Sequence, residues 1–332
     1  MTIKNRNHYI PKTYLEKFLN ENEELFIYKK GEDFFDNSSL KSDRLLVVKG
    51  KDGLNNIAVK KKLYIPEGDL TEDKNIFEDF FNQEVEEKYN EFVSYVDYNF
   101  FDAEKIFSKY RDYIILLISS MLSRTLHSKA EMEEIHKMSF QSYHWAQSFD
   151  NKQRVELKNH LKMNFPDLTD EEAEKNIIDY LGVIEKGEFG IKLPRNLFIK
   201  HIFENLKMYS EIISDMTIQI LRAEGGSYFI TSDVPVVYFV PEHKVNFYFS
   251  HKSLGGPDTE LFFPLTKNLC LFLSRRETPV LSGIPVDKSM VDIVNYNLAH
   301  NSRDYIFSSY KGHFLEKFID NYIPYPFVFR KG

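Results

Sequence analysis

The apolar residues of this chain change their spacing twice, and this change limits the possible folds more than any other feature of its 332 residues. Short runs rich in branched and aromatic side chains, residues 25–29 and 45–49, predict strands near the beginning. From residue 76 the apolar positions recur at intervals of three and four, which predicts amphipathic helices. After Gly225 the short β-rich runs return. Strands at both ends around a helical middle predict an α+β fold.

The order of these segments also predicts how the domain is organised. We expect a single α+β domain over residues 1–332, with one mixed or antiparallel sheet. Its strands come from both ends of the chain, in 24–65 and in 227–310. A large helical block, 75–222, lies between them, either packed on one face of the sheet or inserted as a lobe.

Two helix boundaries can be predicted from local signals. Thr169 and Glu172 have the spacing of a capping box, which opens a helix. A last long helix is expected from residue 197 to about 221, because the following glycine pair is typical of a helix C-terminus.

Composition and the longest apolar stretch exclude several classes of protein. The single cysteine, Cys270, excludes an intrachain disulfide and a zinc site made of several thiolates. Residues 1–18 lack the apolar core of a secretory signal. The longest apolar stretch, 113–122, has about half of the roughly 20 residues that a membrane helix needs. We therefore expect a cytoplasmic protein without a membrane segment.

The charge distribution bears on nucleic-acid binding. A formal net charge of -7 argues against broad, non-specific attachment to phosphates. Residues 41–62 differ from the rest, since they hold seven Lys or Arg side chains and only two Asp. A solvated hairpin is the simpler interpretation of this stretch, and a patch that faces phosphates is the alternative.

Three blocks of sequence, taken in order, resemble a known family. The first is HYIPKTYLEKF at residues 8–18, followed by ELFIYKK. The second is LLISSMLSRT at 116–125, and the third is FITSDVPVV at 229–237 with VDIVNYNLAHNSRDYIF at 291–307. Together they resemble the bacterial domain-of-unknown-function 4238 family. The resemblance implies a bacterial or phage-encoded origin and no established activity, and it leaves residues 132–196 without a match.

The strongest candidate site combines His8, Arg124 and Asp233. Histidine is the side chain best suited to move protons near neutral pH. Arg124 ends an otherwise apolar helix and could clamp a phosphate. Asp233 stands at the end of an expected strand, where it could orient the histidine or hold a metal ion. Such a trio suits a phosphodiester hydrolase, although a buried Arg–Asp pair with two capping residues would explain the same residues structurally.

Arg124 carries a separate expectation, because its helix must be largely buried. A buried guanidinium needs a carboxylate within salt-bridge reach. Asp233 is the first choice for this partner, and Glu84 or Glu87 on the preceding helix is the second.

Four further residues complete the candidate site as binding residues, and all lie in the blocks quoted above. They are Tyr14, Thr231, Ser232 and Asn297.

Three other patterns are weaker. Asp233 with Glu242 and Lys244 superficially matches a metal-dependent nuclease, but nine strand residues at about 3.3 Å each would separate the two carboxylates. Arg154 and His160 have the loose spacing of a helical ribonuclease motif, yet six residues is a poor same-face spacing. Glu133 and His136, with His127 and Glu131 nearby, form half of a carboxylate-bridged metal site, whose second half is absent.

The sequence leaves the activity unknown, and the leading functional hypothesis is a bacterial nucleic-acid-directed hydrolase or a defence or toxin effector. The alternative is a non-catalytic binding or sensor protein that recognises a small anion or a partner protein. No cofactor is evident, and a divalent metal stays open. Nucleic acid or a nucleotide is the expected partner, and protein partners are unknown.

Overall fold

The computed structural model describes residues 5–30, 45–68, 73–148, 151–241, 253–275, 282–312 and 314–316. The chain divides into two compact units. One unit combines Met1–His127 with Arg195–Gly332, and the other is Ser128–Pro194. The smaller unit lies inside the predicted helical block, and the expectation of a single domain stays a prediction.

The helices of the described chain follow one another as α1 (Lys12–Leu15), α2 (Gly50–Gly53), α3 (Ile76–Phe81), α4 (Glu87–Tyr98), α5 (Ala103–Ser123), α6 (Leu126–Ser148), α7 (Asn151–Asn164), α8 (Asp170–Lys186), α9 (Arg195–Ser214) and α10 (Lys288–Asn301). A π-helical turn, η3 (Asn82–Glu86), joins α3 to α4. None of the described helices is long and apolar enough to cross a membrane.

The strands are β1 (Arg6–His8), β2 (Glu24–Lys29), β3 (Leu45–Lys49), β4 (Val59–Lys61), β5 (Thr217–Ala223), β6 (Thr231–Ser232), β7 (Val237–Phe239), β8 (Glu260–Pro264), β9 (Leu269–Ser274), β10 (Ile284–Val286) and β11 (Tyr305–Ser308). Together with the helical middle they make the α+β class that the sequence predicts.

One sheet joins the two ends of the chain, as expected. Its order is β3-β2-β11-β6, and β2 pairs with β11 in an antiparallel register that places Phe26 opposite Ser308. The early run at 25–29 therefore shares a sheet with the C-terminal half. A short two-stranded ribbon, β1 with β4, lies outside this sheet.

The sequence predicted one sheet, but the structure also has a separate five-stranded sheet. Its order is β10-β5-β9-β8-β7, and only β10 and β5 run parallel. The helix expected to reach residue 221 ends at Ser214, so that part of the prediction was wrong. Residues 217–221 alternate branched and polar side chains, a pattern that suits a strand better than a helix. These residues form β5, which pairs with β9.

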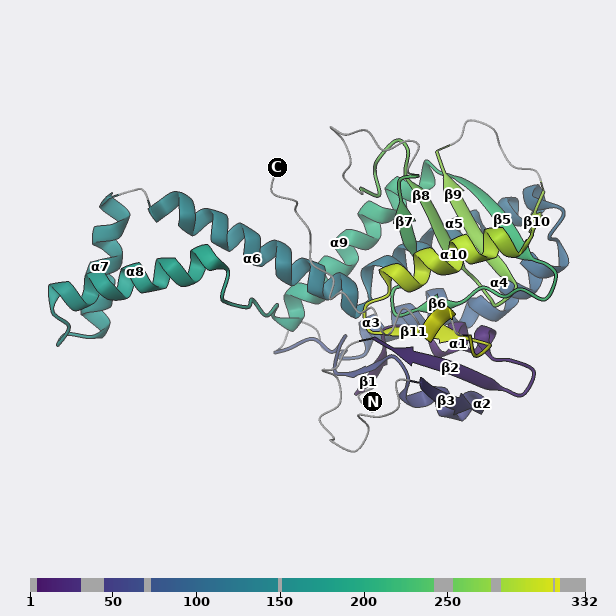
Figure 1. Ribbon diagram of the computed structural model, residues 1–332, viewed down its shortest axis with the longest axis horizontal. Helices are drawn as coiled ribbons and strands as arrows, with labels where there is room; N and C mark the ends of the chain where they lie inside the picture. The colour runs from purple at the N-terminus through teal and green to yellow at the C-terminus, as the bar shows by residue number, and fades with distance from the viewer. Residues whose placement is uncertain are drawn as a thin grey trace. The chain divides into compact units, whose positions relative to one another are not determined.

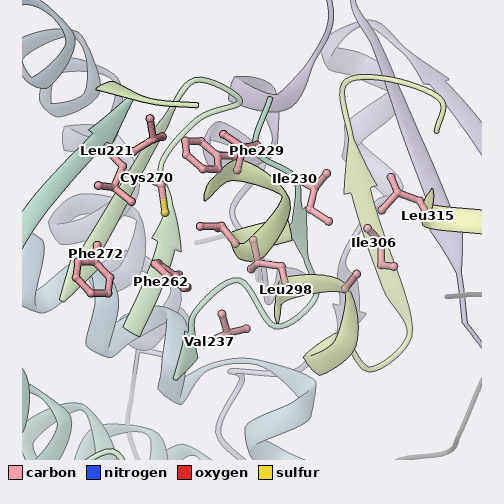
Figure 2. Packing of buried hydrophobic residues seen from close by; sticks show 14 of the residues in the cluster. Leu221, Phe229, Ile230, Val237, Phe262, Cys270, Phe272, Leu298, Ile306 and Leu315 are labelled. Carbon is pink, nitrogen blue, oxygen red and sulfur yellow. The ribbon is translucent and has the colours of Figure 1, made fainter. Parts of the chain in front are cut away.

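The core lies around α10 in the larger unit. In Figure 1, α10 crosses one face of the five-stranded sheet, and α5 lies on the other face. Leu298 of α10 packs with Phe262 and Cys270 of the sheet and with Ile306 of the four-stranded sheet (Figure 2). The apolar side of α10 thus packs against residues of both sheets. Cys270 is buried in this cluster.

The smaller unit consists of helices. Thr169 caps α8 in a capping box, since its hydroxyl accepts from the Glu172 amide and the Glu172 carboxylate accepts from the Thr169 amide. This confirms the predicted helix start. Gly187 ends the same helix with φ 66°, a conformation that glycine adopts without strain.

Candidate functional site

Arg124 stands at the C-terminal cap of α5, where its side chain is 0% exposed. Its Nη2 donates to Glu86 Oε1 at 2.8 Å, and the guanidinium lies 4.8 Å from the centre of the Phe81 ring. The expected carboxylate partner is therefore present, but its predicted identity was wrong. Glu86 closes the π-helical turn η3, which changes the phase of the helix and brings this residue to α5 instead of Glu84 or Glu87.

The surroundings of Arg124 satisfy only part of its hydrogen-bonding capacity. Tyr64 Oη donates to the Arg124 carbonyl at 3.0 Å. Within the described part of the chain, the buried Nε and Nη1 atoms of Arg124 have no hydrogen-bond partner. Burial, the largest single influence, lowers the pKa of Arg124, but Glu86, Tyr64 and Glu78 together raise it above the ordinary value, so the guanidinium stays charged.

His8 lies beside this pair, on β1. Its Nδ1 is 3.1 Å from the carbonyl oxygen of Ile57. A nitrogen that faces a carbonyl must carry hydrogen, so the neutral ring keeps its lone pair on Nε2. Burial lowers the pKa of His8, and Glu86 partly opposes this. The imidazole is therefore neutral near pH 7 and only half-buried.

A second carboxylate completes the cluster. Asn7 is fully buried, and its Nδ2 donates to Glu78 Oε2 at 3.0 Å. The Asn7 Oδ1 accepts from the Tyr64 amide at 3.4 Å. We call Asn7, His8, Tyr64, Glu78, Glu86 and Arg124 the His8–Arg124 cluster.

Asp233 belongs to a different cluster, so its predicted pairing with Arg124 was wrong. Its carboxylate accepts from the backbone amides of Arg303 and Asp304, at 3.0 and 2.7 Å. The side chain is only 4% exposed. Burial, and then the nearby Asp304, raise the pKa of Asp233 to about 6. We call Lys30, Asp233, Arg303 and Asp304 the Asp233 cluster.

Two residues that flank the His8–Arg124 cluster in sequence, Tyr9 and Leu126, link it to the Asp233 cluster. Tyr9 follows His8, and its pKa is raised by burial and then by Asp233. On the other side, Arg303 Nη1 donates to the Leu126 carbonyl at 2.9 Å, two residues after Arg124. The charges of Glu86 and Arg124 both act on His8, so these three side chains form one group, whereas Asp233 has hydrogen bonds of its own.

The predicted binding residues fall into two groups. Tyr14 and Thr231 meet, since their hydroxyl oxygens are 2.7 Å apart, and Tyr14 Oη also donates to the Pro264 carbonyl. Ser232 forms a turn with the backbone of Val234. All three predicted residues of this group are buried. Asn297 lies apart on α10, where its amide donates to the Ile293 carbonyl. Their binding roles stay predictions.

The weaker patterns do not assemble into sites. Glu133 accepts from the Leu193 amide, and Arg154 pairs with Glu174 at 2.7 Å. Residues 242–244 of the nuclease-like pattern lie outside the described residues. Among the residues that are described, no group of three or more His, Cys, Asp or Glu side chains could hold a metal ion.

Sequence reasoning missed four members of the His8–Arg124 cluster. Asn7 immediately precedes the first family block, so its position next to His8 could have identified it as a candidate site residue. Glu86 is one of several glutamates in NQEVEEKYNE, and only the π-helical turn distinguishes it. Tyr64 and Glu78 carry no sequence signal that separates them from other tyrosines and glutamates.

Comparison with family models gives one finding on identity. A model described as a protein of unknown function (DUF4238) matches residues 6–312. Searches of curated proteins and of solved structures gave no match. Since the matched residues cover most of the chain, including both clusters, this protein belongs to the DUF4238 family.

Proposed function

We propose that this protein hydrolyses phosphodiester bonds in nucleic acid, with His8 as the general base. The observation that carries the proposal is the state of His8. The Ile57 carbonyl holds the hydrogen on Nδ1, the lowered pKa keeps the ring neutral, and Nε2 is left with its lone pair. A half-buried imidazole of this kind can still reach water and substrate.

The chemical step is simple to write. His8 Nε2 takes a proton from water while the water oxygen forms a bond to phosphorus. The bond between phosphorus and the leaving oxygen breaks, and the protonated His8 returns the proton to that oxygen. Glu86 acts as a positioning residue, because its carboxylate favours the protonated imidazole and binds Arg124 at 2.8 Å.

The test measures cleavage of labelled RNA and DNA by the purified protein. His8→Ala should lower the cleavage rate at least about 100-fold, since a general base contributes about 10²–10⁴. His160→Ala, which removes an exposed imidazole from α7, is the matched control and should cleave normally. The acid limb of the wild-type rate should lie below pH 6.5, the ordinary histidine value. Full activity in His8→Ala would refute the proposal. Measuring the cleavage rate with and without EDTA tests whether the reaction needs a divalent metal.

A role as a defence or toxin effector is the cellular form of the same proposal. Expression of the wild-type protein should then arrest bacterial growth, while His8→Ala should not.

Non-catalytic binding of a small anion is the second candidate, and a separate observation favours it. Two donors of Arg124, Nε and Nη1, have no acceptor among the described residues. A buried donor without an acceptor is costly, and an anion oxygen would satisfy it. Calorimetry with inorganic phosphate should then show binding to the wild-type protein and none to Arg124→Met. Binding of phosphate that survives Arg124→Met would contradict this candidate.

A further inference from the structure

We propose that the β1–β4 ribbon carries a surface that binds the phosphate backbone of a nucleic acid. Five cationic side chains on and beside the ribbon make up what we call the ribbon patch: Arg6 and Lys61 on the face of His8, Lys60 on the opposite face, Lys62 directly after β4, and Lys12 on α1. The inference rests on the proposed function, because it names the surface that would deliver a substrate to His8.

The first two cations contact only neutral groups in the described residues. Arg6 Nη2 donates to the Asn55 carbonyl at 3.2 Å and also contacts Asn56 Oδ1. Lys12 Nζ donates to Asn55 Oδ1 at 2.8 Å. These amides position the charges without neutralising them, so the charges stay available to an anion.

The three lysines of and after β4 are all exposed. Neither the ion pairs nor the hydrogen bonds of the described chain involve their ammonium groups. Two nearby lysines behave differently, since Lys49 pairs with Glu24 at 2.9 Å and Lys51 with Glu16 at 3.0 Å. In the described part of the basic stretch, Lys49 and Lys51 are therefore paired, whereas Lys60, Lys61 and Lys62 have no acidic partner among the described residues.

The strand register connects the patch to His8. In the antiparallel pairing, Arg6 lies opposite Lys61, and His8 lies opposite Val59. Because side chains alternate along a strand, Arg6, Lys61 and His8 belong to the same face of the ribbon. A phosphate chain that contacts Arg6 and Lys61 is therefore led along this face towards His8.

The backbone around β4 is unusual as well. Ala58 and Lys62, the residues on either side of β4, have φ of 52° and 56°. Residues other than glycine are uncommon in this left-handed region, and such outliers cluster at functional positions. The surrounding structure holds them, since the Tyr9 amide donates to the Ala58 carbonyl and the Lys62 amide donates to the Asn5 carbonyl.

The overall negative charge of the protein makes a local group of positive charges significant for nucleic-acid binding. At a net charge of -7 the molecule as a whole repels a polyanion. Binding must then depend on a local concentration of positive charge, and its strength must fall steeply with salt as counterions are released. The ribbon patch is such a concentration.

The experiment measures binding of a 30-base-pair DNA and of single-stranded RNA and DNA at several salt concentrations. The His8→Ala background prevents cleavage during the measurement. If all five cations contact phosphates, the affinity for duplex DNA should fall about 500-fold between 50 and 200 mM salt. In the triple variant Lys60→Gln, Lys61→Gln, Lys62→Gln, the same fall should be only about tenfold.

Two matched controls separate the patch from general charge. Lys105→Gln, Lys200→Gln, Lys207→Gln removes three exposed lysines from α5 and α9 and should keep the full salt dependence. The charge-preserving variant Lys60→Arg, Lys61→Arg, Lys62→Arg should keep it too. Circular dichroism verifies that each variant is folded.

The outcomes distinguish this inference from the function on which it rests. An unchanged salt dependence in the glutamine triple variant at 60–62, or an equal loss in the α5 and α9 control, would overturn the inference even if the protein cleaves nucleic acid. Binding through the ribbon patch without any cleavage by the wild-type protein would overturn the proposed function and leave the patch in place. The duplex and single-stranded arms show which form of phosphate backbone the patch prefers.

Discussion

At the scale of single residues, the two partners of the Arg124–Glu86 ion pair differ in their access to water. Arg124 is 0% exposed and Glu86 is 18% exposed. A charge that loses its partner is tolerated better when water can replace that partner. The pair should therefore be asymmetric, with the free energy of unfolding more sensitive to loss of the carboxylate than to loss of the guanidinium.

Substitution of each partner tests this asymmetry. Glu86→Gln leaves Arg124 buried with a weaker acceptor and should lower the free energy of unfolding by about 3–5 kcal/mol. Arg124→Met should cost less, since Glu86 keeps contact with water. The double variant should be more stable than Glu86→Gln alone, because no buried charge is left. Urea unfolding of the three variants measures these differences.

A second ion pair on the surface serves as the control. Lys88 and Glu84 form an exposed pair at 2.6 Å, and Glu84→Gln should cost less than about 1 kcal/mol. Equal effects at Glu84 and Glu86, or a double variant as unstable as Glu86→Gln, would contradict the asymmetry.

At the scale of elements, periodicity predicted long or strongly patterned segments and failed where tertiary pairing decides. The amphipathic pattern from residue 76 is visible in α3 and α4, and β11 lies where a strand was expected. β5 was assigned to a helix, because its alternation is short and directly follows α9. β1 and β4 have three residues each, too few for a periodic signal, and they exist through pairing with each other.

The same limit explains how much of the site could be predicted. His8 and Arg124 were identified by residue type and by the apolar setting of α5, and the structure brings them together. Their shared partner, Glu86, depends on a π-helical turn, which no local pattern in the sequence reveals. Asp233 was placed wrongly because the amides of Arg303 and Asp304 come from a segment 70 residues later, and sequence reasoning does not show such a contact.

At the scale of the whole larger unit, the Asp233 cluster joins three distant segments of the chain. Lys30 follows β2, Asp233 follows β6, and Asp304 precedes β11, all in the sheet that unites the two ends. Lys30 Nζ donates to the carbonyls of Ala299 and Ser302 at 2.9 and 2.8 Å, at the end of α10. Burial raises the pKa of Asp304 as well as that of Asp233. The carboxyl groups of Asp233 and Asp304 therefore lie close together, beside β6 and β11.

This arrangement predicts how stability depends on pH. The pKa of Asp233 is about 6 in the folded protein and 3.8 when unperturbed, so the folded state binds the proton more tightly. The stabilising contribution of protonated Asp233 is complete below pH 3.8 and is lost as pH rises through about 6. Asp233→Asn cannot titrate. Its free energy of unfolding, relative to the wild-type protein, should improve by about 2 kcal/mol between pH 4 and pH 7. Urea unfolding at both pH values measures this shift, whatever the absolute cost of the amide. A difference that stays constant would show that folding does not raise the pKa of Asp233.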